Sequence, residues 1–379
     1  MNGDAPLTTP YKPATQKMVA ACAGVSLATV SHILTGRADR YNEETRNKVL
    51  KAVEALEYRP HQGAQSMRKG RSNLIGVINF GGSQYISFQK LTYVVRGIDA
   101  EGFHTLVHDV FWFIARDSLA TQKMIEAQVE GVLLIHPTLC FTQKHLDVFL
   151  KRGIPVVSIG GEHLRGIPRI LSDKEKGFCE MTSHLLSLGC RRLTLLLGAG
   201  LSEKKRSPSW HRQFAIAGFK RALKAHPNAD GIVHFIHNVD LVANDEPHAN
   251  LYERGSIGMR EILDQKTLPE AVLCSNDSLA LGALTACADA GLQVPHDLAI
   301  TGFENEPVGA VGLLPLTTMA HPIKEIAEEA SRMLLDCVRR HTMPEESLSI
   351  HPSRLVVRRS CGAKLKDSAV GASASSPGK

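Results

Sequence analysis

The sequence lacks any apolar run long enough to cross a membrane, and it lacks closely spaced cysteines. Its long apolar runs are strand-sized, such as GVLLIH at 131–136, whereas a membrane-spanning helix needs about 20 apolar residues. The opening stretch MNGDAPLTTPYKP has no basic segment followed by an apolar one, so no secretory signal is predicted. No two of the eight cysteines stand at C-x-x-C spacing. These absences argue against a disulfide framework or a zinc site and favour the reducing cytoplasm.

Common catalytic motifs are also missing. There is no H-E-x-x-H, G-x-S-x-G or P-loop, and the 17 histidines show no convincing metal spacing. The stretch LLLGAGLSE places Gly198 and Gly200 after a predicted strand, but Glu203 stands where a dinucleotide-binding loop needs its third glycine. An enzyme is therefore the weaker alternative, and no metal or cofactor is expected.

Positive charge is concentrated at the beginning of the chain. Residues 1–72 hold 11 Lys and Arg against 6 Asp and Glu, a net of +5, while the whole 379-residue chain carries +6. A basic segment attached to a near-neutral body favours a polyanion-binding head. A basic terminus that is simply solvated explains the charge equally well, so charge alone leaves both interpretations open. The length suggests two or three domains.

The basic segment has the pattern of a compact helical domain at 14–59, preceded by a disordered arm at 1–13. Three short helices are predicted, each after a side chain that can cap it: Thr15 before 16–22, Ser26 before 27–34 and Asn42 before 43–57. Ala20, Gly24 and Val30 supply the small residue, the turn residue and the inward apolar residue that a helix-turn-helix needs. The alternative is a small dimerisation module.

The second helix of this motif would present one face to DNA. Its outward residues are Leu27, Ala28, Ser31 and His32. The end of such a helix enters the major groove, where side chains reach base edges. Hydroxyl groups can hold phosphates and position the helix without reading sequence. The hydroxyl-bearing candidates are Thr15, Ser26, Thr29 and Ser31.

From residue 73 the pattern changes to alternating strands and helices. Eight strands are predicted, at 74–80, 103–109, 131–136, 154–160, 192–198, 231–237, 270–275 and 297–303. Alternating strands and helices imply parallel sheets covered by helices on both faces. Eight such strands fit two lobes better than one, and ligands in such folds bind near the carboxyl ends of the strands. Residues 60–72 have the composition of a basic linker, and 361–379 that of a disordered tail.

Several stretches together resemble the lac repressor (LacI/GalR) family. They are VAACAGVSLATVSHILTG, then TRNKVLKAVEALEYRPHQGAQSMRKGRSNLIGV, SNDSLALGALTACADAGLQVPHDLAITGFEN, PLTTMAHP and LVVRRS. The resemblance covers roughly residues 14–360 in the family's order. It implies a helix-turn-helix head and a two-lobed α/β core like that of periplasmic binding proteins. The lobes expected are 73–171 with 303–321, and 172–302 with 322–360.

The resemblance also implies a function. Members are cytoplasmic transcription regulators, usually repressors, that bind pseudo-palindromic operator DNA as homodimers. A small molecule, most often a sugar or a nucleobase, binds between the lobes and controls DNA binding. A periplasmic solute-binding protein shares the core, but it would need a signal peptide and would carry no basic head.

Three departures from the family pattern affect the predicted sites. In the family a hinge helix inserts a residue, usually Leu, into the minor groove. Met67 matches that residue here, and Ala64 matches the close-packing position; a passive linker is the alternative. His32 stands where the family usually has a guanine-reading Arg, so we expect a weakened or changed base preference; a contact with phosphate is the alternative. The family's ligand-clamping Arg corresponds to Ala215; Arg212 is a candidate substitute, and a surface charge is the alternative.

Further effector contacts follow from the same resemblance. The family's Asn-Asp pair corresponds to Asn276 and Asp277 at a predicted helix start. A carboxylate there can accept hydrogen bonds from sugar hydroxyls, although either residue could serve only as a helix cap. Phe80, at the end of the first strand of the core, could stack on a sugar ring.

Overall fold

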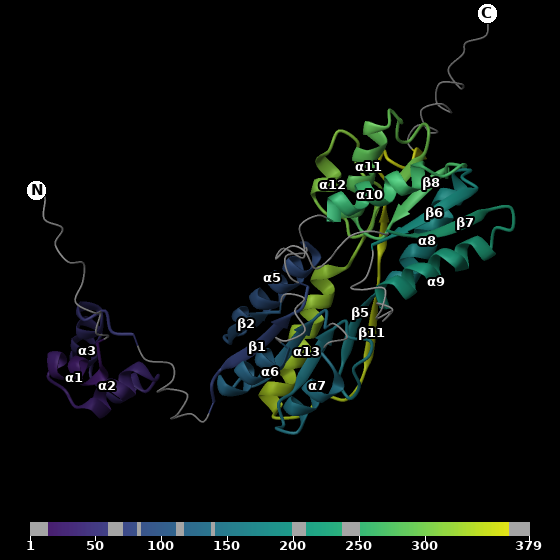
Figure 1. The fold of residues 1–379 in the computed structure, drawn as a ribbon. Helices are drawn as coiled ribbons and strands as arrows, with labels where there is room; N and C mark the ends of the chain where they lie inside the picture. Colours follow the sequence, from purple (N-terminus) through teal and green to yellow (C-terminus); the bar gives the residue numbers. More distant parts are fainter. Residues whose placement is uncertain are drawn as a thin grey trace, which may run out of the picture. The chain divides into compact units, whose positions relative to one another are not determined.

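The structure is a computed structural model that describes residues 14–59, 71–81, 85–110, 117–137, 141–198, 210–236 and 251–363. The chain divides into two compact units, Met1–Ser72 and Asn73–Lys379, called here the head and the core (Figure 1). The arm predicted at 1–13 lies outside the described residues, as do most of the predicted hinge and tail. Among the described residues no single helix is long and apolar enough to cross a membrane.

The head contains the predicted helix-turn-helix. Its helices are α1 (Gln16–Ala23), α2 (Leu27–Leu34), the short 3-10 helix η1 (Ala38–Arg40) and α3 (Glu43–Ala55). Each predicted cap accepts a hydrogen bond from its helix: Thr15 from the Met18 N–H at 3.3 Å, Ser26 from Thr29 at 3.1 Å and Asn42 from Thr45 at 2.9 Å. Gly24 ends α1 with φ +64°, a conformation that costs glycine little.

Six buried side chains form the core of the head: Val19, Ala20, Val30, Ile33, Val49 and Ala52. Ala20 and Val30 occupy the inward positions that the sequence predicts. Such a small cluster buries little area, so each of its side chains matters for the stability of the head.

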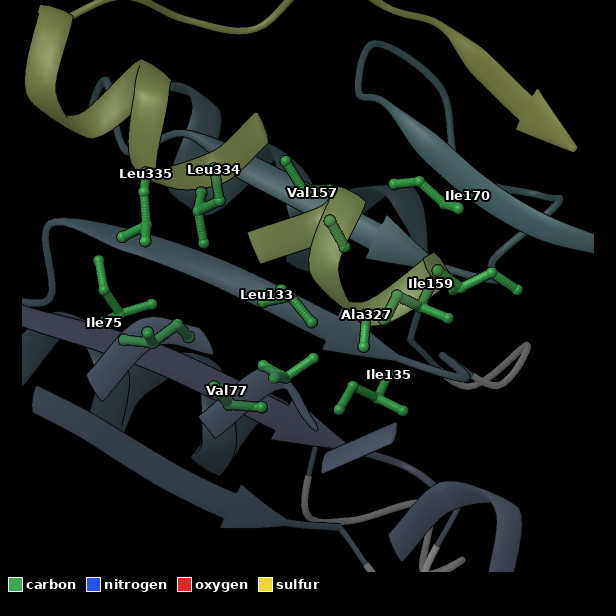
Figure 2. Close-up of a cluster of buried hydrophobic side chains, with 14 of the residues drawn as sticks. Ile75, Val77, Leu133, Ile135, Val157, Ile159, Ile170, Ala327, Leu334 and Leu335 are labelled. Carbon is green, nitrogen blue, oxygen red and sulfur yellow. The ribbon is translucent and has the colours of Figure 1, made fainter. Parts of the chain in front are cut away.

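The first lobe of the core is a parallel six-stranded sheet in the order β11-β5-β4-β3-β1-β2. Its strands are β1 (Leu74–Asn79), β2 (His104–Asp109), β3 (Gly131–Ile135), β4 (Val156–Ile159), β5 (Arg169–Asp173) and β11 (Leu348–Pro352). One face packs against α5 (Tyr85–Ala100) and α13 (Ile323–Arg340), and the other against α6 (Asp117–Glu126) and α7 (Gln143–Leu150). Figure 2 shows Leu334, Leu335 and Ala327 of α13 over the strand residues of the first face.

The second lobe is a parallel four-stranded sheet in the order β7-β6-β8-β9. Its strands are β6 (Arg192–Leu197), β7 (Asp230–Phe235), β8 (Ala271–Cys274) and β9 (Ala299–Thr301). One face packs against α8 (Lys174–Ser187) and α9 (Trp210–Lys224), and the other against α10 (Leu251–Leu263) and α11 (Asp277–Asp289). The remaining elements are the short helix α12 (Val308–Val311) and the antiparallel pair β10 (Thr318–Ala320) and β12 (Arg354–Val356). All eight predicted strands are present, with ends shifted by one or two residues.

The division between the lobes differs from the expected one. Helix α13 packs on the first sheet, and β11 pairs with β5 at its edge, so residues 323–352 belong to the first lobe rather than the second. Conversely, Phe303 and Met319 pack in the second lobe rather than the first. The reason is burial: the apolar stripe of α13, including Ile326, Ala330 and Leu334, completes the cover of the first sheet.

The chain therefore passes between the lobes at three places within the described residues: 173–174, 321–323 and 352–354. The first and second crossings contact each other, because the Ser172 hydroxyl and His321 Nδ1 lie 2.7 Å apart. The His321 ring also packs against Phe303, with centroids 5.1 Å apart. Short connections of this kind are where two lobes can change their relative angle.

Candidate functional site

The predicted DNA-facing residues share one side of α2. Leu27 is 40% exposed and Ala28 is exposed, while Ser31 and His32 are half-buried. Val30 and Ile33 point the other way, into the head. The helix thus offers a face with two apolar side chains, one hydroxyl and one imidazole. These groups can contact a thymine methyl, a phosphate and one base-edge atom respectively.

The predicted phosphate-binding hydroxyls lie at helix starts. Thr15 and Ser26 cap α1 and α2, and the Ser26 and Thr29 hydroxyls lie 2.8 Å apart. Helix starts favour anions because their N–H groups and dipoles point outward. A hydroxyl that accepts from a backbone N–H can still donate its own proton to a phosphate oxygen.

His32 has a partner that the sequence analysis missed. Its Nδ1 lies 2.9 Å from the Tyr41 hydroxyl, across the turn that follows α2. No periodic pattern relates two residues nine positions apart across a turn, so only the fold reveals this pair. Ala64 and Met67, the predicted hinge contacts, lie outside the described residues.

In the core, the Asn276-Asp277 pair stands at the start of α11. Asn276 caps that helix by accepting from the Leu279 N–H at 2.8 Å. Asp277 is fully buried, and its carboxylate accepts from the Glu306 N–H at 2.6 Å and from the Thr318 hydroxyl at 2.5 Å. Burial raises the pKa of Asp277 to about 6. The two hydrogen bonds accepted by Asp277 connect α11 to the loop after β9 and to strand β10.

That loop carries two carboxyl groups that the sequence analysis missed, Glu304 and Glu306. Burial raises the pKa of Glu304 well above its ordinary value, and the neighbouring carboxyls of Glu306 and Asp277 add to the effect. Burial also raises the pKa of Glu306, which accepts from the Ser278 hydroxyl at 3.3 Å. Glu304 has φ +115° and Asn305 has φ +56°, unusual for residues other than glycine. Backbone strain of this kind clusters at functional sites.

Basic groups of the first lobe approach these carboxyls. Lys90 of α5 is buried, with its Nζ 2.6 Å from Nε2 of His136, whose Nδ1 lies 3.0 Å from the Ser87 hydroxyl. Burial and the nearby charge of Lys174 together lower the pKa of Lys90 to about 7, while Glu304 opposes the change. Acidic groups of one lobe and basic groups of the other therefore meet close to the carboxyl ends of β3 and β9.

The carboxyl cluster predicts a pH effect on stability. We expect the Glu304→Gln variant to gain stability relative to the parent protein as pH rises from about 5 to 8. A carboxyl group whose pKa is raised by folding binds more protons in the folded state than in the unfolded state. The folded parent protein therefore loses stability as pH rises above the ordinary pKa of about 4.5. Glutamine does not titrate, so the variant does not suffer this loss. Scanning calorimetry between pH 5 and 8 measures the difference. The exposed Glu180→Gln is the control, and a difference that stays constant with pH would contradict the prediction.

Two family models match the chain. Residues 15–61 match "Bacterial regulatory proteins, lacI family", and residues 182–361 match "Periplasmic binding protein-like domain". The chain therefore carries a lacI-family helix-turn-helix domain in its head and a periplasmic binding protein-like domain in its core. Among curated lacI-type relatives, the HTH-type transcriptional repressor PurR of Salmonella arizonae is 27% identical over 354 residues, or 92% of this chain and 96% of PurR. PurR of Erwinia tasmaniensis is 28% identical over 355 residues, with the same coverage.

Solved structures share the lacI-family fold. A lac repressor dimer bound to operator and the anti-inducer ONPF matches with a TM-score of 0.75 at 22% identity, covering 92% of this chain and 99% of that one. A LacI-family regulator from Enterococcus faecium with bound ribose matches with a TM-score of 0.61 at 22% identity, covering 76% of this chain and 98% of that one.

The remaining predicted effector residues, Phe80 and Arg212, are placed differently from each other. Phe80 is 1% exposed, and its ring packs edge-on against Phe141, so stacking on a ligand stays a prediction that requires this pair to open. Ala215, at the place of the family's Arg, is fully buried in the second lobe. Arg212 is half-buried on α9, and burial lowers its pKa. Within the described ranges no group of three or more His, Cys, Asp or Glu residues is arranged to hold a metal ion.

Proposed function

We propose that this chain represses transcription by binding operator DNA as a homodimer, under the control of a small molecule held between the lobes of its core. The observation that carries the proposal is the outward face of α2 in a capped helix-turn-helix head, joined in one chain to a two-lobed core. Leu27, Ala28, Ser31 and His32 would read or contact one half-site. The two heads of a dimer would read half-sites related by two-fold symmetry.

The proposed role of the hinge is to read the centre of the operator. Met67 would insert between two base pairs in the minor groove, with Ala64 one turn earlier allowing close approach. An apolar wedge unstacks a step and bends the duplex. Pyrimidine–purine steps bend most easily, so one is expected at the centre of the operator.

For the effector we propose a sugar or a related metabolite. Similar regulators have been solved with ribose and with cellobiose. In this chain the hydrogen-bonding groups would come from Asn276, Arg212, Glu304 and Lys90. Asp277 would hold the Glu304–Glu306 loop in position. Because these groups come from both lobes, a ligand between them would alter the angle at the three crossings. We further propose that the chain acts in the cytoplasm and catalyses no reaction.

Selection from a random duplex DNA pool tests the proposal, using the purified full-length chain at one stated salt concentration. The expected result is a pseudo-palindrome with a deformable central step. Adding ribose, cellobiose or related sugars is then expected to change the affinity for that operator by at least about fivefold for one of them. Recovery of no motif, with and without these sugars, would overturn the proposal.

A further inference from the structure

The environment of His32 limits how its imidazole can read DNA. Its Nδ1 is engaged by the Tyr41 hydroxyl at 2.9 Å, and the two rings are 6.1 Å apart between centroids. That leaves Nε2 as the ring nitrogen available to a base. The side chain therefore presents one polar atom, in contrast to the two that an arginine would present.

Both the backbone and the ring of His32 are held in place. The His32 carbonyl accepts from the Arg37 N–H at 3.0 Å and from the Thr35 N–H at 3.3 Å. Tyr41 is anchored in turn, because its ring packs against the apolar cluster of the head and its N–H donates to the Ala38 carbonyl at 3.0 Å. Tyr41 thus fixes the His32 ring through a chain of contacts that reaches the core of the head.

The chemistry of the pair selects one tautomer. A phenol hydroxyl is a stronger hydrogen-bond donor than a neutral imidazole N–H, and the unprotonated imidazole nitrogen is the stronger acceptor. The Tyr41 hydroxyl then donates to Nδ1, and the ring proton of His32 resides on Nε2. The negative potential of DNA favours the same arrangement, because it places an N–H donor toward the groove.

We propose that Tyr41 is a positioning residue for base recognition, which holds His32 so that its Nε2–H selects guanine at one position of each half-site. Guanine offers two acceptors in the major groove, N7 and O6, whereas cytosine offers an amino donor that would oppose an N–H. Adenine and thymine present one acceptor each, so the expected affinity for them lies between those for guanine and cytosine. The inference rests on the proposed operator binding and adds the identity of the base and the residue that enforces it.

The test is a complete base-substitution series on the selected operator. Dissociation constants are measured for all four base pairs at every symmetric position, with the parent chain and with Tyr41→Phe, His32→Ala and Tyr58→Phe. Phenylalanine keeps the ring packing of Tyr41 and removes only the hydroxyl. Tyr58→Phe is the matched control, because Tyr58 also packs against the head cluster. Circular dichroism confirms that each variant stays folded.

The parent chain is expected to prefer guanine over cytosine by roughly five- to tenfold at one position, the scale of a single hydrogen bond. Tyr41→Phe should lose most of that preference at the position where His32→Ala loses it, and nowhere else. Tyr58→Phe should keep the parent profile, and affinity for non-operator DNA should be equal for all four proteins.

Two results would overturn the inference while leaving operator binding intact. One is a Tyr41→Phe profile identical to that of the parent chain. The other is a preference for cytosine at the position lost in His32→Ala, which would place the proton on Nδ1. Absence of base preference at every position in the parent chain would refute the proposed function itself, and this inference with it.

Discussion

Val30→Asp is expected to reduce operator affinity by at least about a thousandfold, down to the level of non-operator DNA. Val30 is fully buried in the six-residue cluster of the head. An unpaired carboxylate buried there costs several kcal/mol, about as much as a domain of this size has to lose. The head should therefore unfold, and the DNA-facing side of α2 should be lost with it.

The measurement is a DNA-binding titration combined with a thermal melt of the full chain. Because head and core are separate compact units, the melting of the core should stay unchanged. Leu50→Asp is the matched control, since Leu50 lies on α3 and is 52% exposed. It adds the same negative charge without burying it. Equal losses of affinity in both variants would assign the effect to charge and refute the folding explanation.

Gly282→Ala is expected to destabilise the core by about 3 kcal/mol or more, because α10 and α11 touch through their backbones at this point. A Cβ atom on Gly282 would lie 1.8 Å from the Tyr252 carbonyl oxygen and 2.8 Å from the Ser256 nitrogen. Gly255 on the facing helix is equally crowded, with a Cβ only 2.1 Å from the Leu279 oxygen. The helices would have to separate, and α11 carries Asn276 and Asp277 at its start.

Urea unfolding of the core measures the loss. Gly97→Ala is the control, because Gly97 lies inside α5 and its added Cβ would meet nothing closer than Ser331 at 3.5 Å. There the same substitution should stabilise the protein by about 0.5–1 kcal/mol, since alanine restricts the unfolded chain and favours a helix. Similar effects at both glycines would contradict the close-contact argument.

The sequence predicted the elements whose causes are local. Thr15, Ser26 and Asn42 are short polar side chains placed directly before apolar helical repeats, and each caps its helix. The eight predicted strands are apolar runs of the kind that parallel sheets bury. Strands β5 and β11 were missed, because RILSD and LSIHP mix polar and apolar residues. Edge position explains the pattern of β11, where Leu348 and Ile350 are half exposed.

Long-range placement could not be predicted in the same way. The apolar stripe of α13 predicts a buried helix, but it does not indicate which of the two sheets the helix covers. Lys90 lies in an amphipathic helix, where a lysine is expected on the exposed side, and only the fold brings it to His136. Tyr41 and Glu304 lie in a turn and a loop whose course depends on packing, so their contacts could not be predicted. The residues of the α2 face were predicted, but the hydrogen bond between His32 and Tyr41 was not.

The three crossings between the lobes have a consequence for biosynthesis. All four strands of the second-lobe sheet, β6 to β9, lie within residues 192–301, whereas the first-lobe sheet needs α13 and β11, which end at residue 352. As the chain leaves the ribosome from its N-terminus, the second-lobe sheet can assemble while the first still lacks one covering helix and one edge strand. The first-lobe sheet, which begins first, is therefore expected to be completed after the second-lobe sheet, leaving an apolar sheet face for chaperones to shield during translation.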